Sequence, residues 1–158
     1  MTTFTALTRN TKATSIVSAV CRFGLAALWF YSGIVKFLDP VGTQKSVEAY
    51  ELFPTDFAQF IGTVLPLVEI ALGILFLLGI FLRPVSVLSG VMFVAFAVGI
   101  ASAWARGLTI DCGCFGIGGQ NPDVTWATYF WGIAKNVLFL AMAAWTVWRP
   151  FRTFAIYP

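Results

Sequence analysis

Residues 57–82 read FAQFIGTVLPLVEIALGILFLLGIFL and residues 85–105 read VSVLSGVMFVAFAVGIASAWA, with Arg83-Pro84 between the two apolar stretches. At about 1.5 Å of rise per residue, each stretch makes a helix long enough to cross the roughly 30 Å hydrocarbon core of a bilayer. Proline cannot continue a helix without strain, so Arg83-Pro84 predicts a tight turn. The second stretch is rich in small residues, which let transmembrane helices approach closely.

Two further apolar stretches flank this pair, at about residues 15–38 and 126–148. Thr125 or Asp123 is placed to cap the start of the last stretch, and Arg149-Pro150 ends it. In the link between the first two spans, a few apolar positions predict a short amphipathic segment lying on the membrane: Val47, Tyr50, Leu52 and Phe53. The sequence therefore predicts an all-α integral membrane protein, a four-transmembrane-helix bundle over residues 15–149, with a polar N-terminal segment 1–14 and a C-terminal tail 150–158.

The composition supports this fold class and excludes several kinds of function. Hydrophobic residues make up 59% of the chain and charged residues 11%, against roughly 25% charged in soluble domains, so a soluble globule is excluded. The basic residues are scattered, which argues against a nucleic-acid partner. The chain has no histidine, and this excludes hydrolytic triads built on that residue.

The basic residues also set the expected orientation. One side of the predicted bundle carries Arg9, Lys12, Arg83, Arg149 and Arg152, and the other carries Lys36, Lys45 and Arg106. By the positive-inside rule, both termini are expected in the cytoplasm. We therefore expect a multi-pass protein of a bacterial plasma (inner) membrane, with the glycine-rich loop 106–123 facing the oxidising compartment outside.

That loop contains Cys112 and Cys114, separated by Gly113. A relaxed disulfide needs Cα atoms roughly 4.4 to 6.8 Å apart, which an i,i+2 pair reaches only in a bent backbone, and glycine permits the bend. So small a ring should be strained, and strained bridges are easily reduced, which favours thiol exchange over structural bracing. The supporting loop residues are Arg106, Asp111, Gly113, Phe115 and Gly116; Asp111 would oppose thiolate formation and Arg106 would offset it.

Two other interpretations of the cysteines remain open. The pair could be a loop brace or two unreactive thiols. Two thiolates with Asp111 could hold a soft cation, but a closed site needs about four ligands and the chain has no histidine, so no metal site is predicted. Cys21, in the first span, is interpreted as a small packed hydrophobic residue.

Charged and polar residues inside the predicted spans form a second candidate site: Arg22, Glu69, Lys135 and Asn136. Counted along their helices, Glu69 and Lys135 both lie roughly 15 to 18 Å below the outer surface. Because lone charges at that depth are costly, we expect the two to pair, either as a structural ion pair or in proton or quinone chemistry. Arg22 either joins this cluster or extends to the cytoplasmic face, and Lys36 is expected to reach the outer interface.

With these residues in view, the chain resembles the DoxX-like superfamily of small four-helix membrane proteins and, within it, the methylamine-utilisation MauE family. The resemblance covers about residues 21–148 and rests on four motifs: residues 29–37 (WFYSGIVKF), residues 65–69 (LPLVE), Arg106-Gly107, and residues 111–116 (DCGCFG). The last is the most specific. The family usually has Arg-Asn in the fourth helix, where this chain has Lys135-Asn136.

The resemblance implies a function in disulfide formation or maintenance with a thioredoxin-fold partner outside the membrane, as in maturation of methylamine dehydrogenase. It also suggests quinone as an electron acceptor, with no cofactor bound covalently. The leading hypothesis is a membrane thiol-disulfide relay, a thiol-disulfide oxidoreductase using Cys112 and Cys114. The alternatives are a non-catalytic membrane anchor or assembly subunit of an oxidoreductase or respiratory complex, and a small transporter using Glu69 and Lys135.

Overall fold

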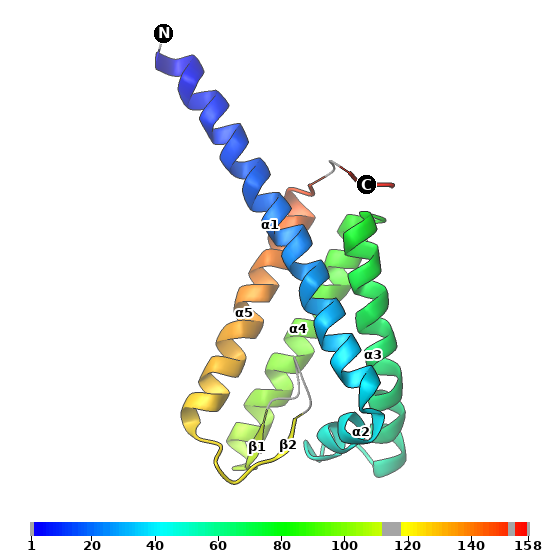
Figure 1. Ribbon diagram of the computed structural model, residues 1–158. Helices are drawn as coiled ribbons and strands as arrows, with labels where there is room; N and C mark the ends of the chain where they lie inside the picture. Colours follow the sequence, from blue (N-terminus) through cyan, green and yellow to red (C-terminus); the bar gives the residue numbers. More distant parts are fainter. Residues whose placement is uncertain (1, 112–117, 152–153, 158) are drawn as a thin grey trace.

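A computed structural model describes residues 2–111, 118–151 and 154–157. It has four long helices, each with a stretch long and apolar enough to cross a membrane: α1 (Thr2–Leu38), α3 (Thr55–Leu78), α4 (Leu82–Ala105) and α5 (Trp126–Trp148). A short helix, α2 (Pro40–Glu48), and two short strands, β1 (Ile110–Asp111) and β2 (Gly119–Gln120), gather at one end of the bundle (Figure 1). The prediction of a four-helix membrane bundle is confirmed.

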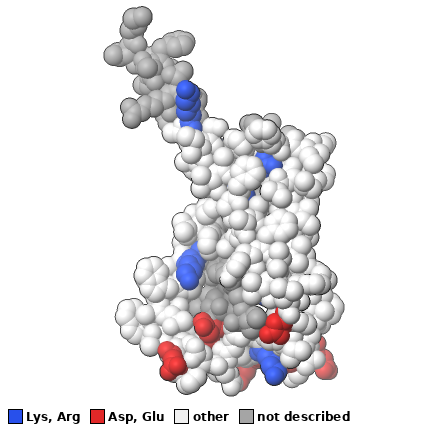
Figure 2. Space-filling model, in the orientation of Figure 1, with Lys and Arg blue, Asp and Glu red and all other residues white. Residues whose placement is uncertain are grey.

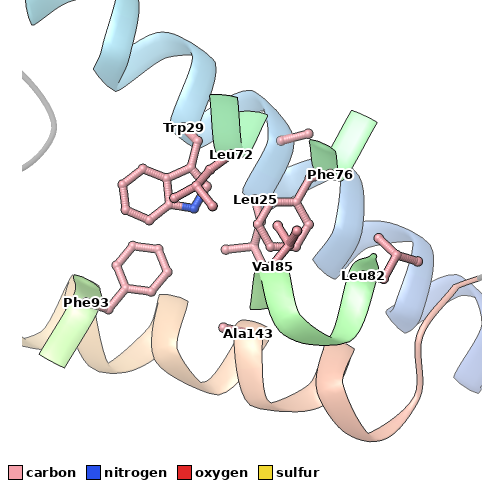
Figure 3. Packing of buried hydrophobic residues seen from close by; sticks show 9 residues of the cluster. Leu25, Trp29, Leu72, Phe76, Leu82, Val85, Phe93 and Ala143 are labelled. Atoms are coloured by element: carbon pink, nitrogen blue, oxygen red, sulfur yellow. The ribbon is translucent and has the colours of Figure 1, made fainter. Parts of the chain in front are cut away.

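Helix α1 packs mainly on α3, and α4 packs mainly on α5. The core between these two pairs is shown in Figure 3, where the Trp29 ring stacks on Phe93 with centroids 4.8 Å apart. The Trp29 indole N–H donates to Ser89 Oγ at 2.8 Å, so this buried polar atom has a partner. Large apolar side chains such as Val91 and Val98 remain exposed on the outer faces, where a bilayer would cover them.

The close contact between α1 and α3 depends on a glycine. A Cβ atom on Gly33 would lie 2.7 Å from Ile70 Cγ1 and 3.0 Å from the Pro66 carbonyl oxygen. Those separations are shorter than normal van der Waals contact, so any side chain at this position would push the two helices apart. Pro66 itself stays inside α3.

The turn between α3 and α4 comes earlier than the sequence pattern indicates. Helix α3 ends at Leu78 because Gly79 takes the left-handed conformation, with φ of 69°, as glycine commonly does after a helix. Helix α4 then begins at Leu82, and Pro84 lies in its first turn, where proline is tolerated because its missing N–H has no helical partner there. At the start of α5, Thr125 is the N-cap residue, as predicted.

The two ends of the bundle differ in charge. Every acidic residue except Glu69 belongs to the end that contains α2, β1 and β2: Asp39, Glu48, Glu51, Asp56, Asp111 and Asp123. Figure 2 shows the acidic residues gathered at this end, whereas basic residues appear at both ends of the molecule. We refer to this end as the acidic end.

Candidate functional site

The cysteine segment begins and ends in a two-stranded hairpin stem at the acidic end. Strands β1 and β2 pair antiparallel, with Ile110 opposite Gln120 and Asp111 opposite Gly119. The predicted residues Cys112, Gly113, Cys114, Phe115 and Gly116 follow directly after Asp111 and lie outside the described residues. The stem nevertheless fixes where the cysteine segment leaves and rejoins the bundle.

Side chains from α2 and α5 hold this stem in place. Ser46 Oγ on α2 donates to the Gly118 carbonyl oxygen at 2.5 Å, at the root of the cysteine segment. On α5, the Tyr129 hydroxyl donates to the Leu108 carbonyl oxygen and accepts from the Ile110 N–H at 3.3 Å. Because Ile110 is only 3% exposed, the stem is packed as well as hydrogen-bonded.

Two of the five predicted supporting residues, Arg106 and Asp111, lie in the described part of the chain, and both interact with the α2–α3 connection. The Arg106 guanidinium donates to the carbonyl oxygens of Tyr50 and Glu51, which fastens that connection to the end of α4. Burial, followed by the negative charge of Asp111 and the influence of Tyr129, raises the pKa of Tyr50 to about 12. Tyr50 is therefore uncharged at neutral pH, and it lies close enough to Asp111 for that negative charge to raise the pKa of its hydroxyl.

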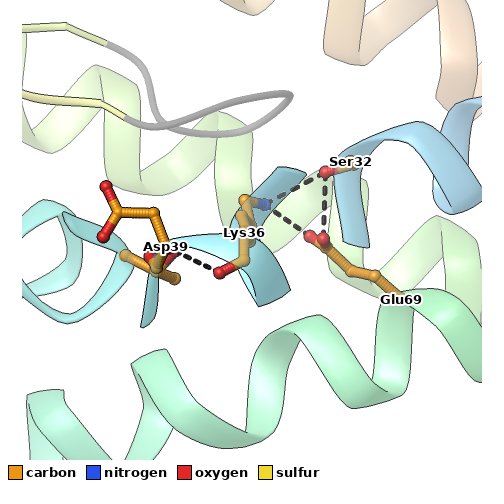
Figure 4. Close-up of polar contacts among 5 residues, drawn as sticks. Ser32, Lys36, Asp39 and Glu69 are labelled. Atoms are coloured by element: carbon orange, nitrogen blue, oxygen red, sulfur yellow. Dashed lines mark hydrogen bonds and ion pairs between the residues drawn. The ribbon is translucent and has the colours of Figure 1, made fainter. Parts of the chain in front are cut away.

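Inside the membrane-spanning region, Glu69 forms a salt bridge with Lys36. Lys36 Nζ lies 2.6 Å from Glu69 Oε1 and donates to Ser32 Oγ at 3.1 Å, and Ser32 Oγ donates to Glu69 Oε2 at 2.9 Å (Figure 4). Lys36 is 2% exposed and Glu69 0%. The expected partner of Glu69, Lys135, was therefore wrong, and so was the expectation that Lys36 reaches the outer interface.

Sequence reasoning does not bring Ser32 and Lys36 into the site. The signal that could have found them is their i,i+4 spacing, which places the hydroxyl and the ammonium on one face of α1. Gly33, which directly follows Ser32, lies in close contact with α3. These three residues together indicate that this face of α1 packs against the helix that carries Glu69.

Lys135 and Asn136 do not join this ion pair. The Lys135 side chain is exposed on α5. Asn136 is 1% exposed and donates from Nδ2 to the Gly132 carbonyl oxygen at 2.9 Å, but its Oδ1 has no hydrogen-bond partner among the described residues. The adjacent positions thus face different surroundings, one the outer surface of the bundle and the other its interior.

Arg22 neither joins the Glu69 cluster nor extends into solvent. It is fully buried and donates to the carbonyl oxygens of Phe76 and Leu77 at 2.9 Å each, and to those of Phe151 and Phe154. The last carbonyls of a helix have no partner within the helix, so Arg22 satisfies the end of α3 and ties the C-terminal segment to it. Cys21 is 7% exposed and not in a disulfide, which fits a packed side chain.

This architecture defines a class: a polytopic helical membrane protein with a buried ion pair between two spans and a short hairpin stem anchored at one end. Residues 14–149 match the family described as methylamine utilisation protein MauE. This chain therefore belongs to the MauE family.

One curated relative is the methylamine utilization protein MauE of Paracoccus denitrificans, which is 28% identical over 123 residues. The aligned region is 77% of this chain and 66% of that relative, so it spans slightly less than two thirds of the relative's length. No solved structure matches the chain.

Proposed function

We propose that this protein is a membrane thiol-disulfide relay in which Cys112 and Cys114 exchange electrons with a thioredoxin-fold protein outside the cytoplasm. The observation that carries the proposal is the anchored stem: Ser46 and Tyr129 hold both roots of the cysteine segment against the bundle. Because both roots are fixed, a docking partner has a defined place on the bundle from which to approach the segment that carries the thiols. Oxidation of the two thiols to one disulfide releases two electrons and two protons, which must pass to an acceptor.

We further propose that the relay serves methylamine utilisation. This follows the name of the Paracoccus denitrificans relative and of the matching family. The partner would then be a thioredoxin-fold protein that forms or rearranges disulfides in an enzyme of that process. Deleting the gene and testing growth on methylamine, with another carbon source as the control, tests this part separately from the thiol chemistry.

The proposed orientation places the acidic end outside and both termini in the cytoplasm of a bacterial plasma membrane. Support comes from the exposed Arg83 at the α3–α4 turn, at the end opposite the stem. A reporter fused after Pro158 should be active only in the cytoplasm, and a membrane-impermeant thiol reagent should reach Cys114 from outside after reduction. A cytoplasmic Cys114 would place the pair in a reducing compartment and exclude the relay in this form.

Trapping in cells tests the chemistry directly. Cys112→Ser and Cys114→Ser, made singly, should each leave one thiol that accumulates a mixed disulfide with a thioredoxin-fold protein, identified by mass spectrometry. Cys21→Ser is the matched control, because Cys21 is buried inside α1 and should not affect trapping. In the unmodified chain, alkylation should show the pair cycling between reduced and oxidised forms; a pair fixed in one state contradicts the relay.

A second candidate function, an anchor or assembly subunit in a larger membrane complex, is favoured by one observation. Exposed Lys135 lies about nine residues into α5, where a charge facing hydrocarbon is costly unless a neighbouring protein or lipid head group covers it. This alternative would be favoured if the natural chain, purified in a mild detergent, carries a stoichiometric membrane partner that the Lys135→Met variant lacks. It also requires that the cysteines of the natural chain do not cycle in cells.

A further inference from the structure

A cavity of about 470 Å³ lies near the acidic end, lined by residues from α1, α2, the α2–α3 connection, α3 and α4. Its apolar walls include Leu65 on α3 and Met92 and Phe96 on α4. The volume falls within the roughly 300 to 1,000 Å³ of typical small-molecule sites. The cavity is therefore large enough to hold part of a lipid or another hydrophobic molecule.

The cavity can be reached from the bilayer. Its lining includes Val98 on α4, which is 62% exposed, and Leu52 and Phe53 in the α2–α3 connection, which are 45% and 47% exposed. In a membrane-spanning bundle these apolar side chains contact lipid, so a hydrophobic molecule dissolved in the bilayer meets the entrance without crossing water.

The polar side chains of Lys36, Thr43 and Ser46 also belong to the lining, and each already has partners within the protein. The Lys36 ammonium binds Glu69 and Ser32. The two hydroxyls donate to main-chain carbonyl oxygens. These groups therefore offer little to a polar ligand inside the cavity.

Tyr50 lines the cavity with its ring, which lies 3.6 Å from the position that a Cβ atom on Gly99 would take. Its hydroxyl is close enough to Asp111 and Tyr129 for both to raise its pKa. The hydroxyl thus lies toward the hairpin stem, and the cavity meets the aromatic ring. The interior of the site favours an apolar occupant.

Hydrogen-bonding capacity is found instead beside the entrance, on Arg106. Within the described part of the chain, three of the five N–H groups of this exposed guanidinium are used, on the carbonyl oxygens of Ser102, Tyr50 and Glu51. Tyr50 lines the cavity, and Glu51 directly precedes the entrance residue Leu52. The two remaining N–H groups are suited to an anionic oxygen such as that of a phosphate.

Arg106 also stands at the right height above the cavity for a lipid head group. The α4 wall residues between Met92 and Gly99 lie seven to fourteen residues before Arg106, which is about 10 to 21 Å along the helix. Gly99 and Arg106, seven residues apart, share one face of α4. Because one leaflet contributes about 15 Å to the hydrocarbon core, a head group at Arg106 puts an acyl chain at the depth of this wall.

Glu51 supplies the opposite charge close to Arg106. Its side chain is exposed, and its carboxylate has no salt bridge with another described residue. A guanidinium and a carboxylate close together match the phosphate and the ammonium of a zwitterionic head group. The other acidic residues at this end disfavour a head group with net negative charge. A primary ammonium donates hydrogen bonds to a carboxylate, which the quaternary ammonium of choline cannot do.

We propose that the cavity binds one acyl chain of a phosphatidylethanolamine molecule, whose phosphate lies on Arg106 and whose ammonium lies beside Glu51. The place of the available polar groups selects this ligand, because they lie at the entrance and the interior is apolar. A ring with polar atoms inside the cavity would leave them without partners, whereas an acyl chain buries no polar atom. The inference does not depend on the thiol-disulfide relay.

Two substitutions on α4 test the acyl-chain site with a matched control. Ala95 lines the cavity and is exposed, so Ala95→Phe should narrow the site without disturbing the core. Ala101 is also exposed but lines the groove toward α5, so Ala101→Phe adds the same side chain elsewhere. Dioleoyl phosphatidylethanolamine would be titrated into the full chain in detergent and followed by native mass spectrometry. We expect one saturable lipid per chain, bound at least about tenfold more weakly by Ala95→Phe and unchanged in Ala101→Phe.

The head-group contacts are tested by changing the lipid. The unmodified chain should bind dioleoyl phosphatidylethanolamine about tenfold more tightly than the phosphatidylcholine or phosphatidylglycerol with the same chains. Glu51→Gln should abolish the preference for ethanolamine over choline while leaving phosphatidylcholine binding unchanged, which serves as the internal control for folding. Equal affinity of the three lipids for the unmodified chain, or a preference for phosphatidylglycerol, would overturn the proposal.

A third measurement needs no variant. A phosphatidylethanolamine with a diazirine in its acyl chain should label peptides from residues 47–53, 61–65 and 92–99 of the unmodified chain, and excess unlabelled lipid should prevent this. Labelling spread evenly over all four spans, or equal binding by Ala95→Phe and the unmodified chain, would mean that only the general lipid coat is present and would overturn the site.

Discussion

Lys36 on α1 and Glu69 on α3 form a 2.6 Å salt bridge inside the membrane-spanning bundle, although Lys36 lies two residues before the end of its helix and Glu69 fourteen residues after the start of its own. At about 1.5 Å per residue, these positions correspond to about 3 Å and 21 Å along the two helices. They meet because α1 ends well inside the length of α3. Helix α2 packs along the remaining part of α3 and closes the bundle beneath α1 (Figure 1).

The ion pair predicts a strongly non-additive response to mutation. Lys36→Met or Glu69→Leu alone leaves a buried group without its partner and should lower the free energy of unfolding by about 3 to 5 kcal/mol. The double variant Lys36→Met/Glu69→Leu should lose less than the sum of the single changes, measured by unfolding in mixed micelles. Combining Glu69→Leu with Lys135→Met is the control, and additivity is expected there; additivity in the Lys36 cycle would contradict the pairing.

Arg22 should stabilise the half of the bundle opposite the acidic end through its carbonyl contacts. Arg22→Met removes the donors to the buried Phe76 carbonyl oxygen and the partly buried Leu77 carbonyl oxygen, and leaving the buried one unsatisfied should cost about 1 to 3 kcal/mol. We expect a lower unfolding temperature and faster proteolysis of the C-terminal segment. Arg83→Met, a change at an exposed position, should have little effect on either measurement. Equal effects of the two changes would argue that Arg22 has no special structural role.

Gly33 should tolerate no side chain. Gly33→Ala would place its Cβ 2.7 Å from Ile70 and should cost about 1 to 3 kcal/mol, since α1 and α3 must separate. Gly90→Ala on α4 is the matched control, because its Cβ would lie 3.4 Å from the flexible end of Leu140. Thermal unfolding in detergent compares the two. A Gly33→Ala protein as stable as Gly90→Ala would mean that the α1–α3 contact is looser than described.

Tyr50 should make the fold sensitive to alkaline pH. Its folded-state pKa of about 12 lies above the ordinary value of 10.0, so the folded chain keeps a proton that the unfolded chain has already lost. This contribution to stability is fully present below pH 10 and is lost as the pH rises through 12. The stability difference between the natural chain and Tyr50→Phe should therefore change between pH 9 and 12. A stability difference between the natural chain and Tyr50→Phe that stays constant over this pH range would refute the shift.

The sequence by itself determined the elements that depend on local properties. The length of the apolar stretches defined the four spans. Gly79 and Pro84 lie at the turn that Arg83-Pro84 indicates, because the backbone restrictions of proline and glycine act within a few residues. Thr125 could be recognised as a cap, and Cys21 as a packed side chain, for the same reason. The acidic end is likewise visible in the order of charges along the chain.

Tertiary structure alone decided which charges meet. Counting depth from each helix end assumes that all helices reach the same level at the acidic end. Helix α1 ends further inside the bundle than α3 begins, so Glu69 pairs with Lys36 instead of Lys135. Arg22 finds the end of α3 and the C-terminal segment, contacts between residues far apart in sequence that no local pattern encodes. The cavity lined by residues such as Thr43 on α2, Leu65 on α3 and Phe96 on α4 is of the same kind, because it exists only where the packing of separate elements leaves space.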